Sequence, residues 1–141
     1  MKIIKTGKSI AIAITILGLI HNVATFSPVI KGALSCLPSN ELNSMLYMSL
    51  MCGSALIISG FILRILLNKL LNYPFLITPI MILGIFLGFN GICIIIFMGN
   101  LFVNPFALIG ILLNLSMFLI TIALAINLKR KPKEKRWFNY L

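Results

Sequence analysis

Acidic residues are almost absent from this sequence, which contains 2 Asp and Glu residues among 141. Both acids, Glu41 and Glu134, lie outside the long apolar runs. A carboxylate proton relay of the kind that many membrane pumps use is therefore missing. The single His and the 3 Cys do not cluster, so we expect no metal site.

Signatures of catalysis are also missing. Cys36, Cys52 and Cys93 are isolated, with no Cys-x-x-Cys pair for thiol redox chemistry. The sequence has no glycine-rich phosphate loop and no nucleophile elbow. We therefore expect neither an enzyme nor a cofactor, and we interpret Cys52 and Cys93 as buried packing residues.

Apolar residues are abundant instead. They make up 60% of the chain against 10% charged residues, with a mean hydropathy of +1.11. Four runs, at residues 9–26, 45–67, 75–98 and 105–128, reach or approach the roughly 20 residues that a helix needs to cross a bilayer. The runs are continuous rather than alternating, which favours helices over a membrane barrel. We predict one all-α domain over residues 1–141, an integral membrane four-helix bundle.

Positive charges predict the orientation of this bundle. Short cytoplasmic loops carry an excess of Lys and Arg, and of the 12 such residues only Lys31 would lie outside if both termini were inside. We expect both termini to lie inside (N-in and C-in). A dual-topology dimer would require nearly balanced charge on the two sides, and this chain does not have it. A cleaved signal peptide is the alternative for the first run, but no convincing small-x-small site follows it.

The longest connection, residues 27–44, contains apolar residues, so we expect a short interfacial turn or helix there. At its end, Ser39 and Asn40 are predicted to cap the second helix, with Glu41 near the positive end of the helix dipole.

Prolines mark the later helices. Asn104-Pro105 is typical of an N-cap followed by proline at the first helical position. Tyr73-Pro74 opens the third helix similarly, and Pro79 is expected to bend that helix by removing one backbone hydrogen bond.

Each predicted helix carries small and polar residues at spacings of three and four. In lipid, such stripes pack helices together, and they are also able to line a polar cavity. The candidate packing glycines are Gly18, Gly53, Gly84, Gly88, Gly91 and Gly110. The candidate polar interior consists of His21, Asn22, Asn90, Asn114 and Thr121.

His21 has two interpretations. It is either a hydrogen-bonded structural residue or a working proton acceptor or ligand, because the pKa of histidine is easily tuned. Glu41 is the one acid placed where it could reach His21 at the outer surface.

A basic cluster follows the fourth helix and precedes the aromatic residues that end the chain. Such a cluster is attracted to anionic lipid, although fixing the topology alone also requires it. We expect no nucleic-acid binding, because no recognition fold is available. The candidate lipid-contacting residues are Lys129, Arg130, Lys131, Lys133, Lys135 and Arg136.

The run Ile16-Leu17-Gly18-Leu19-Ile20-His21 resembles the Gly-x-x-His signature of small bacterial four-helix membrane proteins of the DoxX-like kind. Cys52-Gly53-Ser54-Ala55 in the second helix and Asn104-Pro105-Phe106-Ala107 in the fourth are similar to other features of that group. The resemblance implies a fold and a bacterial cytoplasmic membrane, and it brings no established activity.

We therefore expect a non-catalytic accessory or interaction protein of the cytoplasmic membrane, with a membrane-protein partner or a homo-oligomer as its assembly. The alternative is a small oligomeric transporter or channel with a polar bundle interior.

Overall fold

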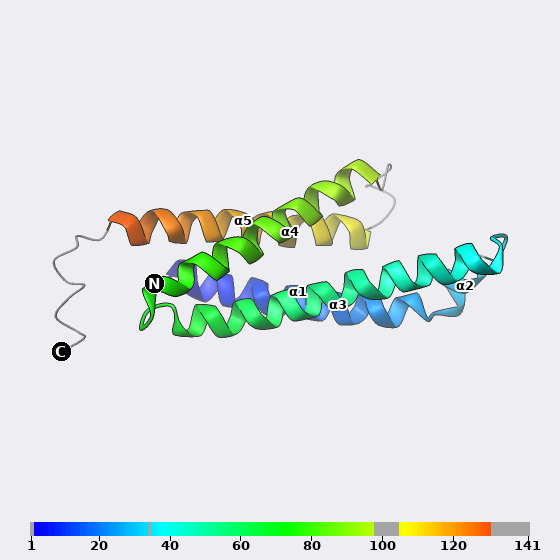
Figure 1. The fold of residues 1–141 in the computed structure, drawn as a ribbon, viewed down its shortest axis with the longest axis horizontal. Helices are drawn as coiled ribbons and strands as arrows, with labels where there is room; N and C mark the ends of the chain where they lie inside the picture. The colour runs from blue at the N-terminus through cyan, green and yellow to red at the C-terminus, as the bar shows by residue number, and fades with distance from the viewer. Residues whose placement is uncertain (1, 34, 98–104, 131–141) are drawn as a thin grey trace.

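The computed structural model describes residues 2–33, 35–97 and 105–130, and every element within them is helical (Figure 1). The all-α prediction is therefore confirmed. In chain order the elements are α1 (Lys2–Thr25), α2 (Pro28–Ala33), α3 (Ser39–Lys69), the 3₁₀ turn η1 (Pro74–Leu76), α4 (Ile77–Phe97) and α5 (Pro105–Arg130).

Four of these segments are long and apolar enough to cross a membrane, as the four runs predicted: Lys2–Thr25, Ser39–Lys69, Pro74–Ile96 and Phe106–Leu128. The first two helices begin earlier than their apolar runs, at residue 2 instead of 9 and at residue 39 instead of 45. Apolar runs predict where lipid begins, whereas Lys, Ser, Asn and Glu can continue a helix into water.

The N-cap of α3 also differs from prediction. The N-cap of α3 is Pro38, with no side-chain cap hydrogen bond, so the predicted cap by Ser39 or Asn40 is wrong. The extended backbone of Pro38 (φ −54°, ψ 148°) starts the helix one residue earlier, and its carbonyl accepts the N–H of Leu42 at 3.0 Å. Glu41 does lie in the first turn.

The other sequence marks fall at helix starts. Pro74 opens η1 and Pro105 opens α5, while α2 provides the short helix expected within residues 27–44. Pro79 is the third residue of α4, among the first N–H positions that have no acceptor within the helix, so the reason for expecting a bend there does not apply. Asn104 lies outside the described residues.

The helices form two antiparallel hairpins, α1 with α3 and α4 with α5. Contacts are extensive within each hairpin, fewer between α1 and α5, and sparse between α3 and α4. The first residue of α1 and the last of α5 lie at one end, called here the terminal end, and α2 lies at the other, called the α2 end (Figure 1). Towards the α2 end, α4 moves away from α3 (Figure 1).

The apolar core explains this divergence. Along α3, the side chains of Leu56, Leu63 and Leu67 are buried, whereas residues 39–52 include no buried side chain. α3 therefore packs against the second hairpin mainly in the half of the bundle next to the terminal end. The other large apolar side chains that are fully buried are Ile14, Leu70, Ile80, Leu87 and Met117.

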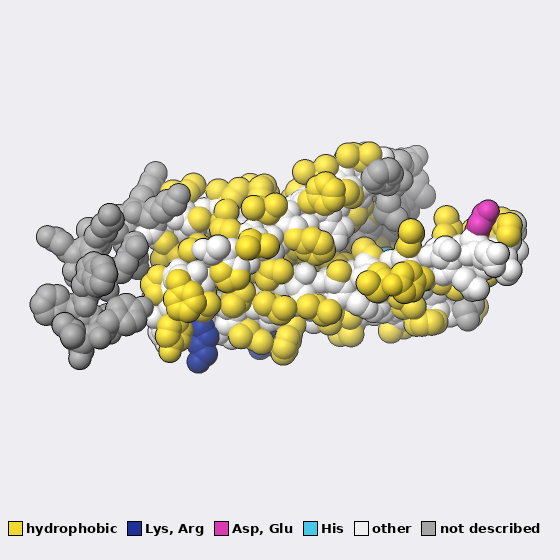
Figure 2. Space-filling view, viewed as in Figure 1, with side chains coloured by type: hydrophobic (Ala, Val, Ile, Leu, Met, Phe, Trp, Pro, Cys, Tyr) yellow, Lys and Arg dark blue, Asp and Glu magenta, His cyan; other side chains and the backbone are white. Residues whose placement is uncertain are grey.

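The surface of the molecule is largely apolar (Figure 2). Val23 is 73% exposed and Phe75 is 69% exposed. A soluble monomer rarely exposes apolar side chains over so wide an area. The Lys and Arg side chains visible in Figure 2 lie towards the terminal end, and the acidic side chain visible there lies at the α2 end. This is the surface of a multi-pass membrane protein, with its charges near the ends of the helices.

Candidate functional site

Glycines bring α1 and α3 into backbone contact. A Cβ atom added to Gly18 would lie 2.6 Å from the carbonyl oxygen of Gly53, and one added to Gly60 would lie 2.6 Å from that of Ala11. Both distances are shorter than van der Waals contact, so no larger residue fits without a shift of the helices. In lipid, small residues that permit such an approach are a main source of helix association.

This close approach gathers polar side chains near the α2 end. The hydroxyl oxygen of Ser49 lies 3.0 Å from Nε2 of His21 and 2.7 Å from Oγ1 of Thr25. Thr25 in turn donates to the carbonyl oxygen of His21 at 2.9 Å. We refer to His21, Asn22, Thr25, Ser49 and Ser54 as the polar cluster.

The proton directions in the polar cluster follow from the number of hydrogens available. All three hydrogen bonds form together only if Thr25 donates its one hydroxyl hydrogen to the carbonyl of His21 and Ser49 donates to Oγ1 of Thr25. Nε2 of His21 then has to donate to Ser49. In this order the imidazole cannot accept the Ser49 proton, which argues against a serine nucleophile activated by His21.

Asn22 joins the same contact from the next position on α1. Its amide Nδ2 donates to the hydroxyl of Ser54 at 3.2 Å, whereas its Oδ1 is buried without a hydrogen-bond partner. That oxygen occupies the place where a Cβ atom of residue 53 would lie. Gly53 therefore accommodates both the α1 backbone and the Asn22 amide, and its Cα–H groups offer Oδ1 weak stabilisation.

Asn90 connects the second hairpin to α3. Its side chain lies beside the thiol of Cys52 across the sparse α3–α4 interface. Cys52 is exposed and Cys93 is partly exposed, so the prediction that both are buried packing residues is wrong. The reason is the divergence of the hairpins, which leaves the Cys52 side chain largely uncovered by α4.

Asn114 and Thr121 lie apart from the polar cluster, on the face of α5 that meets α4. Both are 0% exposed. Thr121 donates to the carbonyl oxygen of Phe118 at 2.7 Å, and its Cβ would lie 2.8 Å from one added to Gly84. Neither side-chain polar atom of Asn114 has a hydrogen-bond partner.

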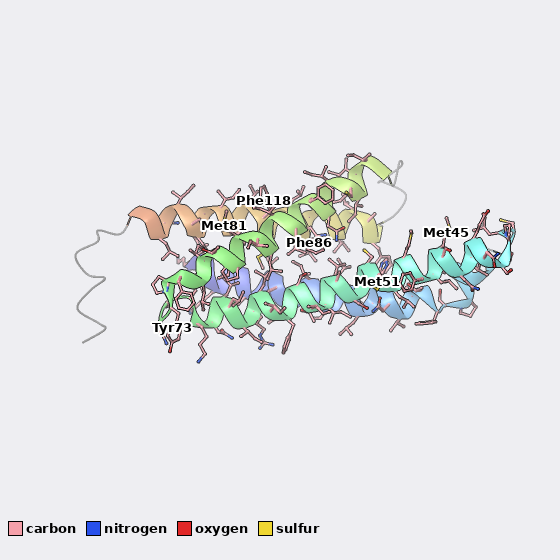
Figure 3. The ribbon with its side chains drawn as sticks, viewed as in Figure 1. Met45, Met51, Tyr73, Met81, Phe86 and Phe118 are labelled. Carbon is pink, nitrogen blue, oxygen red and sulfur yellow. The ribbon has the colours of Figure 1, made fainter. Side chains whose placement is uncertain are left out.

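The remaining predicted glycines also lie between α4 and α5. A Cβ added to Gly88 would lie 2.9 Å from the ring of Phe118, whose position on this seam Figure 3 shows, and one added to Gly91 would lie 3.3 Å from Leu115. Gly110 differs, because its nearest neighbours would be Ile94 and Leu17 at 3.6 and 3.7 Å, which is ordinary contact. Packing in this bundle does not require glycine at position 110.

The predicted polar interior thus occupies three places: the polar cluster, the Asn90–Cys52 pair and the α4–α5 seam. Thr25, Ser49 and Ser54 are partners that the predicted set omitted. Thr25 lies four residues after His21, and Ser49 lies four residues before Gly53, whereas Ser54 is adjacent to Gly53. Choosing among such residues requires the register of α1 against α3.

The basic cluster could not be placed in the same way. Lys129 and Arg130 end α5, and their side chains lie outside the described residues, as do Lys131, Lys133, Lys135 and Arg136 entirely. Among the described cations, Lys2, Lys5, Arg64 and Lys69 are exposed.

The chemistry that these groups offer is neutral hydrogen bonding. Within residues 2–33, 35–97 and 105–130, no group of three or more His, Cys, Asp or Glu side chains is placed to hold a metal ion.

Comparison with protein-family models, with curated proteins and with solved structures found no match.

Proposed function

We propose that this chain is an accessory protein of the bacterial cytoplasmic membrane that acts by binding other membrane components and carries out no reaction itself. The observation that carries this proposal is residues 39–52 of α3, a long helical segment in which no side chain is fully buried. Tyr47 is 63% exposed and Met51 is 54% exposed within it. Figure 3 shows Met51 on this part of α3.

The polar groups support the same proposal. Within the polar cluster the hydroxyl and imidazole groups bond to one another between α1 and α3, so they stabilise the hairpin. The donor order leaves His21 without a serine to activate, and neutral amides and hydroxyls are the groups with which membrane helices bind each other.

Site-specific photocrosslinking in cells tests this function. A photoreactive amino acid at Tyr47 or Met51 is expected to yield a specific adduct with one identifiable membrane component. The control position is Ile82, which is 63% exposed but lies on α4, outside the proposed contact surface. Equal adduct patterns at all three positions, or none at Tyr47 and Met51, would contradict an accessory role for this surface.

A transporter or channel is the second candidate, and Asn114 is the observation that favours it. An amide whose two polar atoms are both unpaired is expensive to bury in a membrane protein, and such residues are functional candidates by default. Purified protein in liposomes tests this candidate. Solute flux that is lost in Asn114→Leu, with helix content unchanged, would favour transport over the accessory role.

We also propose that the terminal end contacts anionic lipid through the basic cluster that begins at Lys129. The clustered charges immediately after a membrane span support this role, at about 1 kcal/mol per Lys or Arg near an anionic surface. Truncation after Leu128 tests it. The truncated protein should lose affinity for vesicles containing anionic lipid, and unchanged affinity would leave the cluster with a role in topology alone.

A further inference from the structure

One face of α3 is covered for half of its length and open for the other half. Near the terminal end this face carries Ser59, Leu63 and Leu70, which are 5%, 0% and 1% exposed. Cys52 lies seven residues before Ser59 and eleven before Leu63, and Met45 lies seven residues before Cys52, so both continue the same face, with Met48 beside them. We refer to Met45, Met48 and Cys52 as the open face.

The open face is exposed because α4 has moved away from it. Met45 is 51% exposed, Met48 is 70% exposed, and Cys52 is also exposed. Figure 1 shows α4 diverging from α3 towards the α2 end, and Figure 3 shows Met45 on this half of α3. The face is thus continuous with an interface that already exists between the hairpins.

Acyl chains do not satisfy the polar groups found here. Cys52 lies eight residues after Ser44, the last of the polar residues that begin α3, which places its thiol about 12 Å along the helix and below the headgroups. Asn90, partly exposed, lies beside this thiol with an amide that has two N–H donors and two acceptor lone pairs. A single thiol cannot satisfy this capacity, and hydrocarbon offers no partner.

A second copy of the chain fits this surface better than lipid does. The charge bias inserts every copy in one orientation, so two copies meet about an axis perpendicular to the membrane with like residues at equal depth. An amide both donates and accepts, which makes Asn90 self-complementary across such an axis. Flexible methionine side chains adapt to an irregular contact of this kind.

We propose that the open face, together with Asn90, binds the same surface of a second copy in a two-fold symmetric dimer. The contact brings Cys52 near Cys52 of the partner subunit and gives each Asn90 amide a second partner. This proposal rests on the membrane location and the shared orientation, and it does not rest on the accessory role.

Cross-linking through Cys52 tests the dimer. The chain is made as C36S/C93S, which retains Cys52 alone, and is reconstituted in liposomes at increasing lipid-to-protein ratio, with a short bis-maleimide as the probe. A covalent dimer is expected, with a yield that stays constant over a tenfold dilution in lipid. Yield that falls in proportion to dilution would indicate random collision and would overturn the proposal.

A neighbouring position provides the matched control. Met51→Cys in a variant with all three native cysteines replaced by serine has nearly the same depth and a similar exposure, but points about 100° further round the helix. Cross-linking at residue 52 should exceed that at residue 51 at least tenfold. Equal yields at the two positions would contradict a specific contact through the open face.

The amide is tested separately. Asn90→Leu in the C36S/C93S background should reduce the Cys52 cross-link at least fivefold while helix content stays unchanged. Asn127→Leu is the control, because Asn127 is exposed and bonds only within α5, to the carbonyl of Ala123 at 2.8 Å. An unchanged dimer in Asn90→Leu would overturn the assignment. If the Cys52 cross-linking shows a monomer while photocrosslinking at Tyr47 gives specific adducts, the dimer is rejected and the accessory function stands.

Discussion

At the scale of single residues, the α1–α3 contact depends on glycines whose missing side chains are replaced by groups from the facing helix. Gly53 is the clearest example, since the Asn22 amide and the Gly18 backbone both lie where its Cβ would be. Gly32 is the opposite case, with nothing within 4 Å of an added Cβ. Comparing an alanine substitution at Gly53 with one at Gly32 therefore measures how much the close packing at Gly53 restricts residue size.

Gly53→Ala should lower the free energy of unfolding by about 1–3 kcal/mol, because overpacking a tight contact forces the backbone to move. Gly32→Ala should change it by less than about 0.5 kcal/mol. Denaturant titration in mixed micelles, followed by circular dichroism, measures both. If the two variants were equally stable, α1 and α3 would not approach as closely as the structure has them.

Ser49 is the central residue of the polar cluster, because it bonds both His21 and Thr25. Ser49→Ala should cost roughly 0.6–1.7 kcal/mol, the range measured for hydrogen bonds between membrane helices. Ser44→Ala is the matched control, since Ser44 is exposed and bonds only the carbonyl of Asn40 within its own helix. Similar losses in both variants would mean that Ser49 contributes nothing across the hairpin.

The donor order also predicts a spectroscopic state for His21. Because Nε2 donates to Ser49, neutral His21 should carry its proton on Nε2, with Nδ1 outside the network. Nitrogen-15 NMR of labelled histidine distinguishes the two tautomers, and the chain has a single His to observe. A neutral Nδ1–H tautomer would reverse the chain and restore His21 as an acceptor for the Ser49 proton.

At the scale of helices, the sequence predicted how many there are better than how they meet. Continuous apolar runs predict spans directly, because each must be about as long as the hydrocarbon is thick. The start of α3 was missed, since Pro38 acts through its backbone and leaves no side-chain cap to recognise. The exposure of Cys52 was missed as well, because it depends on the angle between hairpins, which no local pattern contains.

The α4–α5 seam shows the same limit within one element. The small-residue spacing of Gly84, Gly88 and Gly91 predicted a packing stripe, and the structure gives each a close neighbour on α5. Asn114 lies on the facing stripe and was predicted to be polar lining. Its spacing is that of a packing residue, so the sequence could not indicate that its amide would have no partner.

Asn114→Leu separates these interpretations by stability. If the amide is unpaired, removing it should raise the free energy of unfolding by about 1 kcal/mol or more, since a buried unsatisfied polar group costs about 1–3 kcal/mol. Thr121→Val is the comparison, because Thr121 has a bond to lose, to the carbonyl of Phe118. A large loss of stability in Asn114→Leu would mean that a bound water or solute satisfies the amide.

At the scale of the whole molecule, unequal helix lengths and unequal charges distinguish the two ends. α3 has 31 residues and α4 has 21, which correspond to about 46 Å and 31 Å of helix. Only the longer helix exceeds the hydrocarbon thickness of about 30 Å by a wide margin. The α2 end therefore projects beyond α4 and α5 (Figure 1), while exposed Lys and Arg side chains lie towards the terminal end (Figure 2).

The charge bias predicts that the α2 end faces outward, and cysteine labelling of intact cells tests it. Cys36 is exposed in the connection between α2 and α3, so in C52S/C93S it should react with a membrane-impermeant maleimide without permeabilisation. Asn72→Cys in a variant without native cysteines should react only after permeabilisation, because Asn72 is exposed in the turn at the terminal end. This substitution leaves every Lys and Arg in place, so it does not disturb the bias under test. Reaction of Asn72→Cys in intact cells, with Cys36 protected, would invert the molecule and place the polar cluster towards the cytoplasm.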